Sequence, residues 1–191
     1  MNKDLKQKLI TALVGLFIAA LLAVFIMPDY REGEASIHGA KPPVDFRFTL
    51  NGKEMKLSDL HGHVVVLNFW ASWCPPCIQE TPSLNILEAK VSAAGGIILG
   101  VDPGINEDQS SYEKFLTDYR VTFPTYLDPN KTIAASFGTT MYLETYIIGP
   151  DGKFDRKIIG PQDWTSPDMS AYFDSILGTR SQGGQQSSLI P

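Results

Sequence analysis

The chain has 191 residues, of which 43% are hydrophobic, and it carries a formal net charge of -5. This length suits one folded domain with appended segments. The acidic balance, with no cluster of lysine and arginine beyond the N-terminus, gives no reason to expect a nucleic-acid partner.

The N-terminus combines positive charge with a long apolar run. Residues 1–8 hold three lysines and one acid, and residues 9–27 follow without a charge. The apolar run is long enough to span a bilayer. A cleaved signal peptide is the alternative, but the run exceeds a usual signal core and lacks a small-x-small cleavage site before Pro28. We therefore predict a single transmembrane signal anchor at 9–27, in contact with membrane lipid.

The lysines before this segment predict the orientation of the chain. The positive-inside rule places residues 1–8 in the cytoplasm, and the rest of the chain beyond the anchor on the outer side of the cytoplasmic membrane. Disulfides are permitted there. Residues 28–41 read as a polar tether, 42–178 as the folded domain, and the Gly/Gln/Ser-rich residues 179–191 as a disordered tail.

The first half of the folded domain alternates strands and a helix. A hairpin centred on Asn51-Gly52 is expected first, because apolar residues alternate on both sides of this turn signal. Val64 to Phe69 reads as a buried central strand. A helix is expected from about Cys74 to Ala94, where Gly95-Gly96 ends it. Ile97 to Val101 is a second buried strand.

The second half continues the alternation. Asn106 is expected to cap the next helix, with Glu107 and Asp108 in its first turn. The apolar face of that helix follows helical spacing at Tyr112, Phe115, Leu116 and Tyr119. The remaining expected elements are a strand at 125–127, a short helix at 131–137, a hairpin of strands 145–148 and 154–159, and a last helix from Ser166-Pro167 to Gly178.

This order of elements is thioredoxin-like. The predicted class is α/β, with a central mixed sheet flanked by helices and an N-terminal β-hairpin extension. Helical crossovers make the early strands parallel, and the late hairpin adds antiparallel edge strands.

Both cysteines of the chain lie in the run "NFWASWCPPCIQETP". A purely structural disulfide between Cys74 and Cys77 closes a tiny loop, which contributes less than the roughly 3 kcal/mol of a 15-residue loop. A zinc site needs about four ligands, and His61 and His63 are the candidates to join the cysteines. No second Cys-x-x-Cys supports that alternative.

A redox centre fits the local pattern better. Cys74 is expected at a helix N-terminus, where unpaired N–H groups and the helix dipole favour a thiolate. Cys77 lies one turn later on the same face, within disulfide reach. Pro75 and Pro76 fit the first helical turn and stiffen the loop. Trp70 and Trp73 precede Cys74 and are candidates to flank its sulfur with apolar surface. The alternative for Trp70 is a core residue.

The run resembles the active site of the TlpA/ResA/DsbE-like branch of the thioredoxin superfamily, and "FPTYLD" and "YIIGPDGKF" resemble later family segments. The resemblance covers about residues 42–178. It implies a membrane-anchored, extracytoplasmic thiol–disulfide oxidoreductase, of a kind that in several cases serves cytochrome c maturation. It favours a reductase of exported protein disulfides, supplied with electrons by a membrane thiol carrier of the CcdA/DsbD type. The Cys74–Cys77 disulfide is then the redox group, with no other cofactor.

Mechanism follows from thiol chemistry. Cys74 attacks a target disulfide, and Cys77 resolves the mixed disulfide. Cytoplasmic thioredoxins place a buried Asp on the preceding strand, but Asn68 stands at that position here. The family resemblance implicates Glu80 instead, as the group that transfers the proton or sets the cysteine pKa values, with its own pKa raised if it is buried. The alternative is a surface glutamate of the helix.

The sequence departs from the family where a cis-proline normally faces the cysteine pair. It reads "MYLETYIIGPDGK", which places Leu143 at that position, and Pro124 in "FPTY" belongs to the preceding strand instead. A cis bond before a residue other than proline costs about 3–4 kcal/mol. We therefore predict a trans bond before Leu143, or a conspicuous strained cis bond. Leu143, Trp73, Pro75 and Pro76 are the predicted substrate contacts.

Other functions are compatible with the same residues. An oxidising enzyme uses the same motif, because residue names do not fix the redox potential. A copper or other soft-metal binding module would use the same cysteine pair. A peroxidase is less favoured, because Ala71 stands where a threonine is wanted, and an inactive scaffold gains no support from the two retained cysteines.

Overall fold

The computed structural model describes residues 13–17, 37–50, 52–104, 108–128, 130–139 and 142–178. The chain divides into two compact units, Met1–Glu32 and Gly33–Pro191.

In the first unit the described residues 13–17 are helical. Within the described part of the chain, no helix has the length and apolar character needed to cross a bilayer. The rest of the predicted anchor 9–27, the flanking residues 1–8 and most of the tether 28–41 lie outside the described residues, as does the predicted tail 179–191. The anchor therefore stays a prediction.

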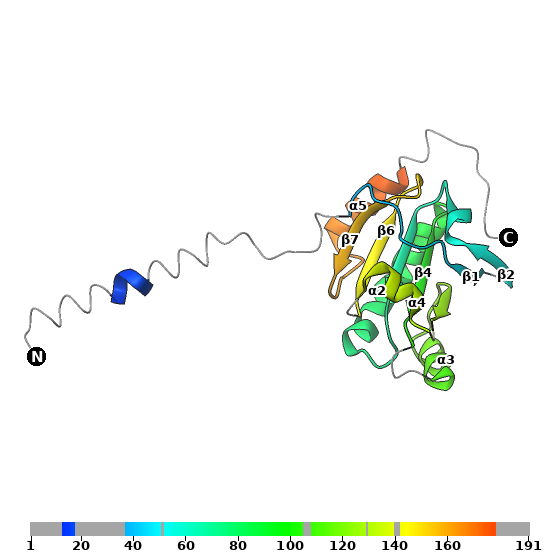
Figure 1. Cartoon of the computed structure of the whole chain (residues 1–191), viewed down its shortest axis with the longest axis horizontal. Helices are drawn as coiled ribbons and strands as arrows, with labels where there is room; N and C mark the ends of the chain where they lie inside the picture. The colour runs from blue at the N-terminus through cyan, green and yellow to red at the C-terminus, as the bar shows by residue number, and fades with distance from the viewer. Residues whose placement is uncertain are drawn as a thin grey trace, which may run out of the picture. The chain divides into compact units, whose positions relative to one another are not determined.

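A five-stranded mixed sheet forms the centre of the second unit (Figure 1). Its order is β5-β4-β3-β6-β7, and the strands are β3 (Val65–Phe69), β4 (Ile97–Asp102), β5 (Thr125–Leu127), β6 (Glu144–Ile148) and β7 (Phe154–Ile159). The first three strands are parallel to each other, and β6 and β7 are antiparallel to their neighbours. The predicted thioredoxin-like architecture is confirmed. One detail is corrected: of the two hairpin strands, β6 lies inside the sheet between β3 and β7, and only β7 is an edge strand.

The N-terminal extension is a separate antiparallel hairpin of β1 (Arg47–Leu50) and β2 (Lys53–Lys56), followed by the 3-10 helix η1 (Leu57–Leu60). Phe48 and Leu50 are buried while their neighbours are exposed, as the alternating pattern predicts. Gly52 has a φ of 76°, a left-handed conformation that glycine adopts without strain. The hairpin prediction is therefore confirmed.

Helices cover both faces of the sheet. They are α2 (Pro75–Ala93), α3 (Gln109–Asp118), α4 (Thr132–Phe137) and α5 (Pro167–Gly178). Alternate residues of β3 point to opposite faces. Val65, Leu67 and Phe69 pack with the hairpin and α4, whereas Val66 packs with α2 and α5. Asn68 shares the face of Val66, and this places its amide beneath α2.

The observed ends of helices α2 and α3 test the capping residues predicted from the sequence. Helix α2 begins after Cys74 as N-cap and ends at Ala94, as predicted, with Gly95 in a left-handed conformation. Helix α3 is capped by Asp108, whose carboxylate accepts a hydrogen bond from the Ser111 N–H at 2.8 Å. The prediction that Asn106 caps this helix and Asp108 lies in its first turn is therefore wrong. Asn106 itself lies outside the described residues.

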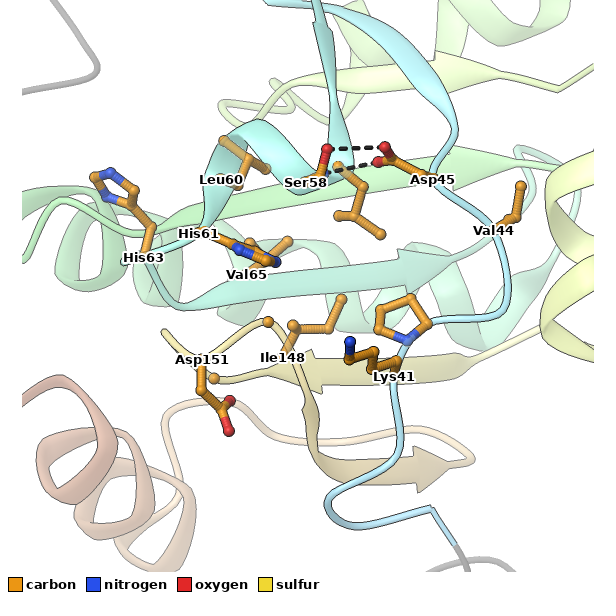
Figure 2. Close-up of a pocket in the computed structure, with 14 residues that line it drawn as sticks. Lys41, Val44, Asp45, Ser58, Leu60, His61, His63, Val65, Ile148 and Asp151 are labelled. Atoms are coloured by element: carbon orange, nitrogen blue, oxygen red, sulfur yellow. Dashed lines mark hydrogen bonds between the residues drawn. The ribbon is translucent and has the colours of Figure 1, made fainter.

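A cavity of about 240 Å³ opens at the start of β3 and the end of β6 (Figure 2). His61 and His63 line it, and His63 is tied by its Nδ1 to the Gly95 carbonyl at 2.5 Å. The cysteine pair follows the other end of β3, and the length of this strand is about 13 Å. The two histidines thus lie far from the cysteines, and a shared zinc site is geometrically excluded. In the described residues no group of three His, Cys, Asp or Glu side chains is placed to hold a metal.

Candidate active site

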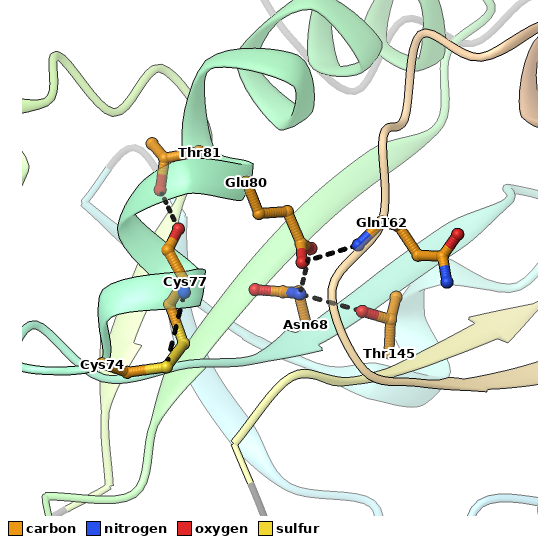
Figure 3. Close-up of a disulfide and its surroundings, with 7 residues drawn as sticks. All are labelled: Asn68, Cys74, Cys77, Glu80, Thr81, Thr145 and Gln162. Atoms are coloured by element: carbon orange, nitrogen blue, oxygen red, sulfur yellow. Dashed lines mark hydrogen bonds between the residues drawn. A yellow bond between two sulfur atoms is a disulfide. The ribbon is translucent and has the colours of Figure 1, made fainter.

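The two cysteines form a disulfide at the N-terminus of α2 (Figure 3). Their Cα atoms are 5.3 Å apart, and Pro75 and Pro76 occupy the first helical turn. The Cys77 N–H donates to the Cys74 sulfur at 3.4 Å. Because this N–H has no partner within the helix, it is available to stabilise a Cys74 thiolate when the pair is reduced. Proline in the first turn loses no helical hydrogen bond.

Both cysteines are buried, with Cys74 at 5% and Cys77 at 3% exposure. They belong to a hydrophobic cluster that also contains Trp70, Tyr112 and Phe115. Such apolar walls keep water away from the sulfurs and strengthen local electrostatic interactions.

The two tryptophans of the motif have different positions. Trp70 is buried, and its ring centre lies 4.4 Å from that of Phe115, so the core alternative holds for this residue. Trp73 is 45% exposed and makes an edge-to-face contact with Tyr142, at 4.6 Å between ring centres. It is therefore accessible for the predicted contact with substrate.

Glu80 is buried in α2, at 5% exposure, so the alternative of a surface glutamate is wrong. Its Oε1 accepts a hydrogen bond from the Trp164 indole N–H at 2.6 Å, and its Oε2 accepts one from the Gln162 N–H at 3.3 Å. Burial raises the pKa of Glu80 to about 7, and these two hydrogen bonds act in the opposite direction. A carboxyl with this pKa exchanges protons near neutral pH.

The side chain of Asn68 projects from β3 toward the carboxylate of Glu80. Its Nδ2 donates to Thr145 Oγ1 at 2.8 Å and lies 3.5 Å from Glu80 Oε1 (Figure 3). The position that carries a titrating Asp in cytoplasmic thioredoxins thus holds a neutral amide that faces Glu80. The titratable carboxyl comes from the helix, as predicted.

A small cavity of about 10 Å³ lies between Cys77 and Glu80. Asn68 and Leu143 contribute to its walls. This volume is close to the minimum for one water molecule, and the polar amide and carboxylate supply the hydrogen-bond partners that such a water needs. The cavity thus brings the side chains of Cys77 and Glu80 to one small, partly polar space.

Leu143 occupies the position opposite the cysteines. The peptide bonds of the described residues are all trans, as predicted for the bond before Leu143. The residue has a φ of 68°, a left-handed conformation that costs an L-residue about 1–2 kcal/mol. Its N–H donates to the Phe69 carbonyl at 2.9 Å, and its carbonyl accepts from the Gly160 N–H at 2.8 Å. Its side chain is buried against the cysteines, and its role in substrate binding stays a prediction.

Trp164, Gln162 and Thr145 are absent from the sequence-based site. No local pattern marks them, because Trp164 is 84 residues from Glu80 along the chain. Only the docking of the segment between β7 and α5 against α2 brings its indole to the carboxylate. A buried tryptophan needs a partner for its N–H, which is a general hint but does not name the partner.

Residues 40–156 match the AhpC/TSA family. The chain belongs to this family. The relatives include the thiol-disulfide oxidoreductase ResA of Geobacillus thermodenitrificans, 31% identical over 176 residues that cover 92% of this chain and 99% of the relative. The ResA of Bacillus subtilis is 29% identical over 160 residues, which are 84% of this chain and 88% of the relative.

The solved structures agree with the sequence relatives. A Chlorobium tepidum protein assigned as thiol:disulfide interchange protein DsbE superposes with a TM-score of 0.65 and 28% identity, covering 75% of this chain and all of that one. Together with the Cys74–Cys77 disulfide, these likenesses make the protein a thioredoxin-like thiol–disulfide oxidoreductase of the ResA/DsbE type.

Proposed function

We propose that this oxidoreductase reduces disulfides of exported proteins on the outer side of the cytoplasmic membrane. The observation that carries the proposal is the disulfide at the N-terminus of α2 beside the buried carboxyl of Glu80. The resemblance to the ResA/DsbE branch favours the reducing direction.

The reaction runs from the dithiol form. The Cys74 thiolate attacks one sulfur of the target disulfide, forms a mixed disulfide and expels the other target sulfur as a thiolate. Cys77, once deprotonated, attacks the Cys74 sulfur, forms the intramolecular disulfide and releases the second target thiolate. Two electrons pass from the cysteine pair to the target. The disulfide that remains is the form described here.

Glu80 handles the proton of the resolving step. Its carboxylate accepts the proton of the Cys77 thiol across the small cavity that joins them. A base with a pKa of about 7 is well matched to this transfer at neutral pH. The hydrogen bonds from Gln162 and Trp164 orient the carboxylate during the step.

The proposal extends to the surroundings of the enzyme. Residues 9–27 anchor the chain in the cytoplasmic membrane with residues 1–8 inside, as the charge distribution of this segment favours. The oxidised pair must be reduced after each turnover, and a membrane thiol carrier of the CcdA/DsbD type supplies these electrons. Apocytochrome c cysteines are one target class that the family resemblance suggests.

The redox equilibrium of the full-length chain in detergent tests the direction of electron flow. The cysteine pair is equilibrated with mixtures of reduced and oxidised glutathione, and the disulfide fraction is measured. A potential well below that of glutathione supports a reductase. A potential far above it indicates an oxidant, and a pair that forms no reversible disulfide but binds Cu(I) tightly rejects the proposed enzyme.

A trapping experiment tests the targets and the roles of the two cysteines. Cys77→Ser leaves the attacking thiol but removes the resolving one, so mixed disulfides with exported proteins should accumulate in cells. Cys74→Ser is the matched control and should trap none. If the two variants trap the same proteins to the same extent, the assignment of attack to Cys74 is wrong.

A further inference from the structure

The segment between β7 and α5 brings a buried indole to the redox site. Trp164 is 2% exposed, and its ring packs against Phe173 with 6.2 Å between ring centres. Its main-chain N–H donates to Ser83 Oγ at 3.3 Å, and its indole N–H donates to Glu80 Oε1 at 2.6 Å. Contacts at its backbone, ring and indole N–H fix the position of the donor.

The two oxygens of Glu80 differ in their partners. Oε1 receives the short indole hydrogen bond and faces the Asn68 amide at 3.5 Å, whereas Oε2 has the longer contact with the Gln162 N–H. An indole N–H can only donate. A proton on Oε1 would therefore compete with the Trp164 donor. Protonation of Oε2 keeps the short bond, and this oxygen is the better place for the proton.

The environment contains no competing charge among the residues that the structure describes. Cys77 faces Glu80 from α2, Asn68 from β3, and Gln162 and Trp164 from the segment before α5. All are uncharged in the oxidised protein, and no charged side chain contributes to the raised pKa of Glu80. The indole hydrogen bond is thus the main specific contact that favours the carboxylate form against burial.

We propose that Trp164 is the positioning residue of Glu80: its indole N–H holds Oε1 and assigns Oε2 as the oxygen that carries the proton. This inference rests on the proposed role of Glu80 in resolving the mixed disulfide. Removal of the indole donor destabilises the carboxylate relative to the carboxylic acid. Hydrogen bonds to charged groups are strong enough that we expect the pKa of Glu80 to rise by about one pH unit, a roughly tenfold change in proton affinity.

The variant Trp164→Phe, made in the full-length chain, keeps an aromatic ring but lacks the N–H. The carboxyl of Glu80 is titrated by infrared difference spectroscopy, with Glu80→Gln identifying the signal. Trp70→Phe is the matched control, because Trp70 is also buried near Cys77 but its indole N–H has no hydrogen-bond partner among the described residues. We expect the pKa of Glu80 to rise in Trp164→Phe and to stay within a few tenths of a pH unit in Trp70→Phe.

A measurement on the unmodified protein tests the same contact even if Trp164→Phe does not fold. The chain has three tryptophans, so three indole N–H signals are expected in a ¹⁵N NMR spectrum of labelled protein. The Trp164 signal should shift with pH and follow the titration of Glu80. In Glu80→Gln that shift should disappear. An indole signal that does not respond to the Glu80 titration overturns the proposed positioning role.

The pH dependence of the resolving step separates this inference from the proposed function. A preformed mixed disulfide on Cys74 is allowed to resolve at pH 5 to 9, and the rate is followed. If Trp164→Phe shifts both the carboxyl titration and the rate profile upward, both proposals stand. A shifted titration with an unshifted rate profile retains the positioning by Trp164 but rejects Glu80 as the base. If neither shifts, Trp164 has no positioning role.

Discussion

Replacement of Leu143 by proline, the residue expected from the family resemblance, should destabilise this protein. Proline fixes φ near -65°, whereas Leu143 has a φ of 68°. Proline also lacks the N–H that Leu143 donates to the Phe69 carbonyl. The backbone at this position therefore fits a residue with an N–H and a left-handed conformation, and proline offers neither.

The size of the effect follows from these contacts and from a glycine control. Leu143→Gly and Leu143→Pro both lose the buried side chain, but glycine keeps the N–H and adopts a positive φ without strain. Loss of the N–H leaves the buried Phe69 carbonyl without its partner, at about 1–3 kcal/mol. A change of φ also disturbs the bond from Gly160, worth about 1 kcal/mol. Proline also lowers the conformational entropy of the unfolded chain, and this offsets about 1 kcal/mol of the expected destabilisation.

We therefore expect the proline variant to be less stable than the glycine variant by about 2 kcal/mol. Urea unfolding of the disulfide form, followed by circular dichroism, measures the difference as a shift in midpoint at constant slope. A proline variant as stable as the glycine variant, or more stable, would show that the left-handed, hydrogen-bonded Leu143 does not govern this loop.

Two further substitutions test buried charges. Because the pKa of Glu80 rises from 4.5 to about 7, the folded protein holds a proton in this range that the unfolded chain has released. Stability should fall by about 3 kcal/mol as pH rises through that window, and Glu80→Gln should remove this slope in urea titrations. If Glu80→Gln kept this pH dependence of stability, another titrating group would be its source. Lys157→Met leaves the carboxylate of Glu144 buried without its ion pair of 2.9 Å, and we expect a loss of about 3 kcal/mol. Lys157→Arg should retain most of the stability, and equal stability of both variants would mean that the pair contributes nothing.

The two elements that carry the disulfide can be predicted from the sequence, because the signals for them are local. A continuous apolar run predicts the buried strand β3, and cysteine and prolines at a helix start predict the N-terminus of α2. The position of the α3 cap is harder to predict from the sequence. Asn106 and Asp108 are both good capping residues two positions apart, and propensity does not choose between them.

The protonation chemistry of the site depends on contacts that no local signal contains. The sequence singles out Glu80 and shows that Leu143 replaces a proline. Burial of Glu80, however, depends on the packing of Trp164 and its neighbours, which tertiary structure alone decides. The left-handed conformation of Leu143 is likewise held by two tertiary hydrogen bonds, to Phe69 of β3 and from Gly160 just after β7, because leucine has no intrinsic preference for it.

The partners of the hydrogen bond between Trp164 and Glu80 are 84 residues apart in the chain, so they are synthesised at different times. A ribosome delivers the two cysteines roughly ninety residues before the indole arrives, at speeds of about 5–20 residues per second. For several seconds the nascent chain holds a thiol pair whose carboxyl neighbour is still open to water. During this interval the carboxyl of Glu80 lacks its hydrogen bond from the Trp164 indole. The buried environment of Glu80 is complete only when the chain as far as Trp164 has joined the fold.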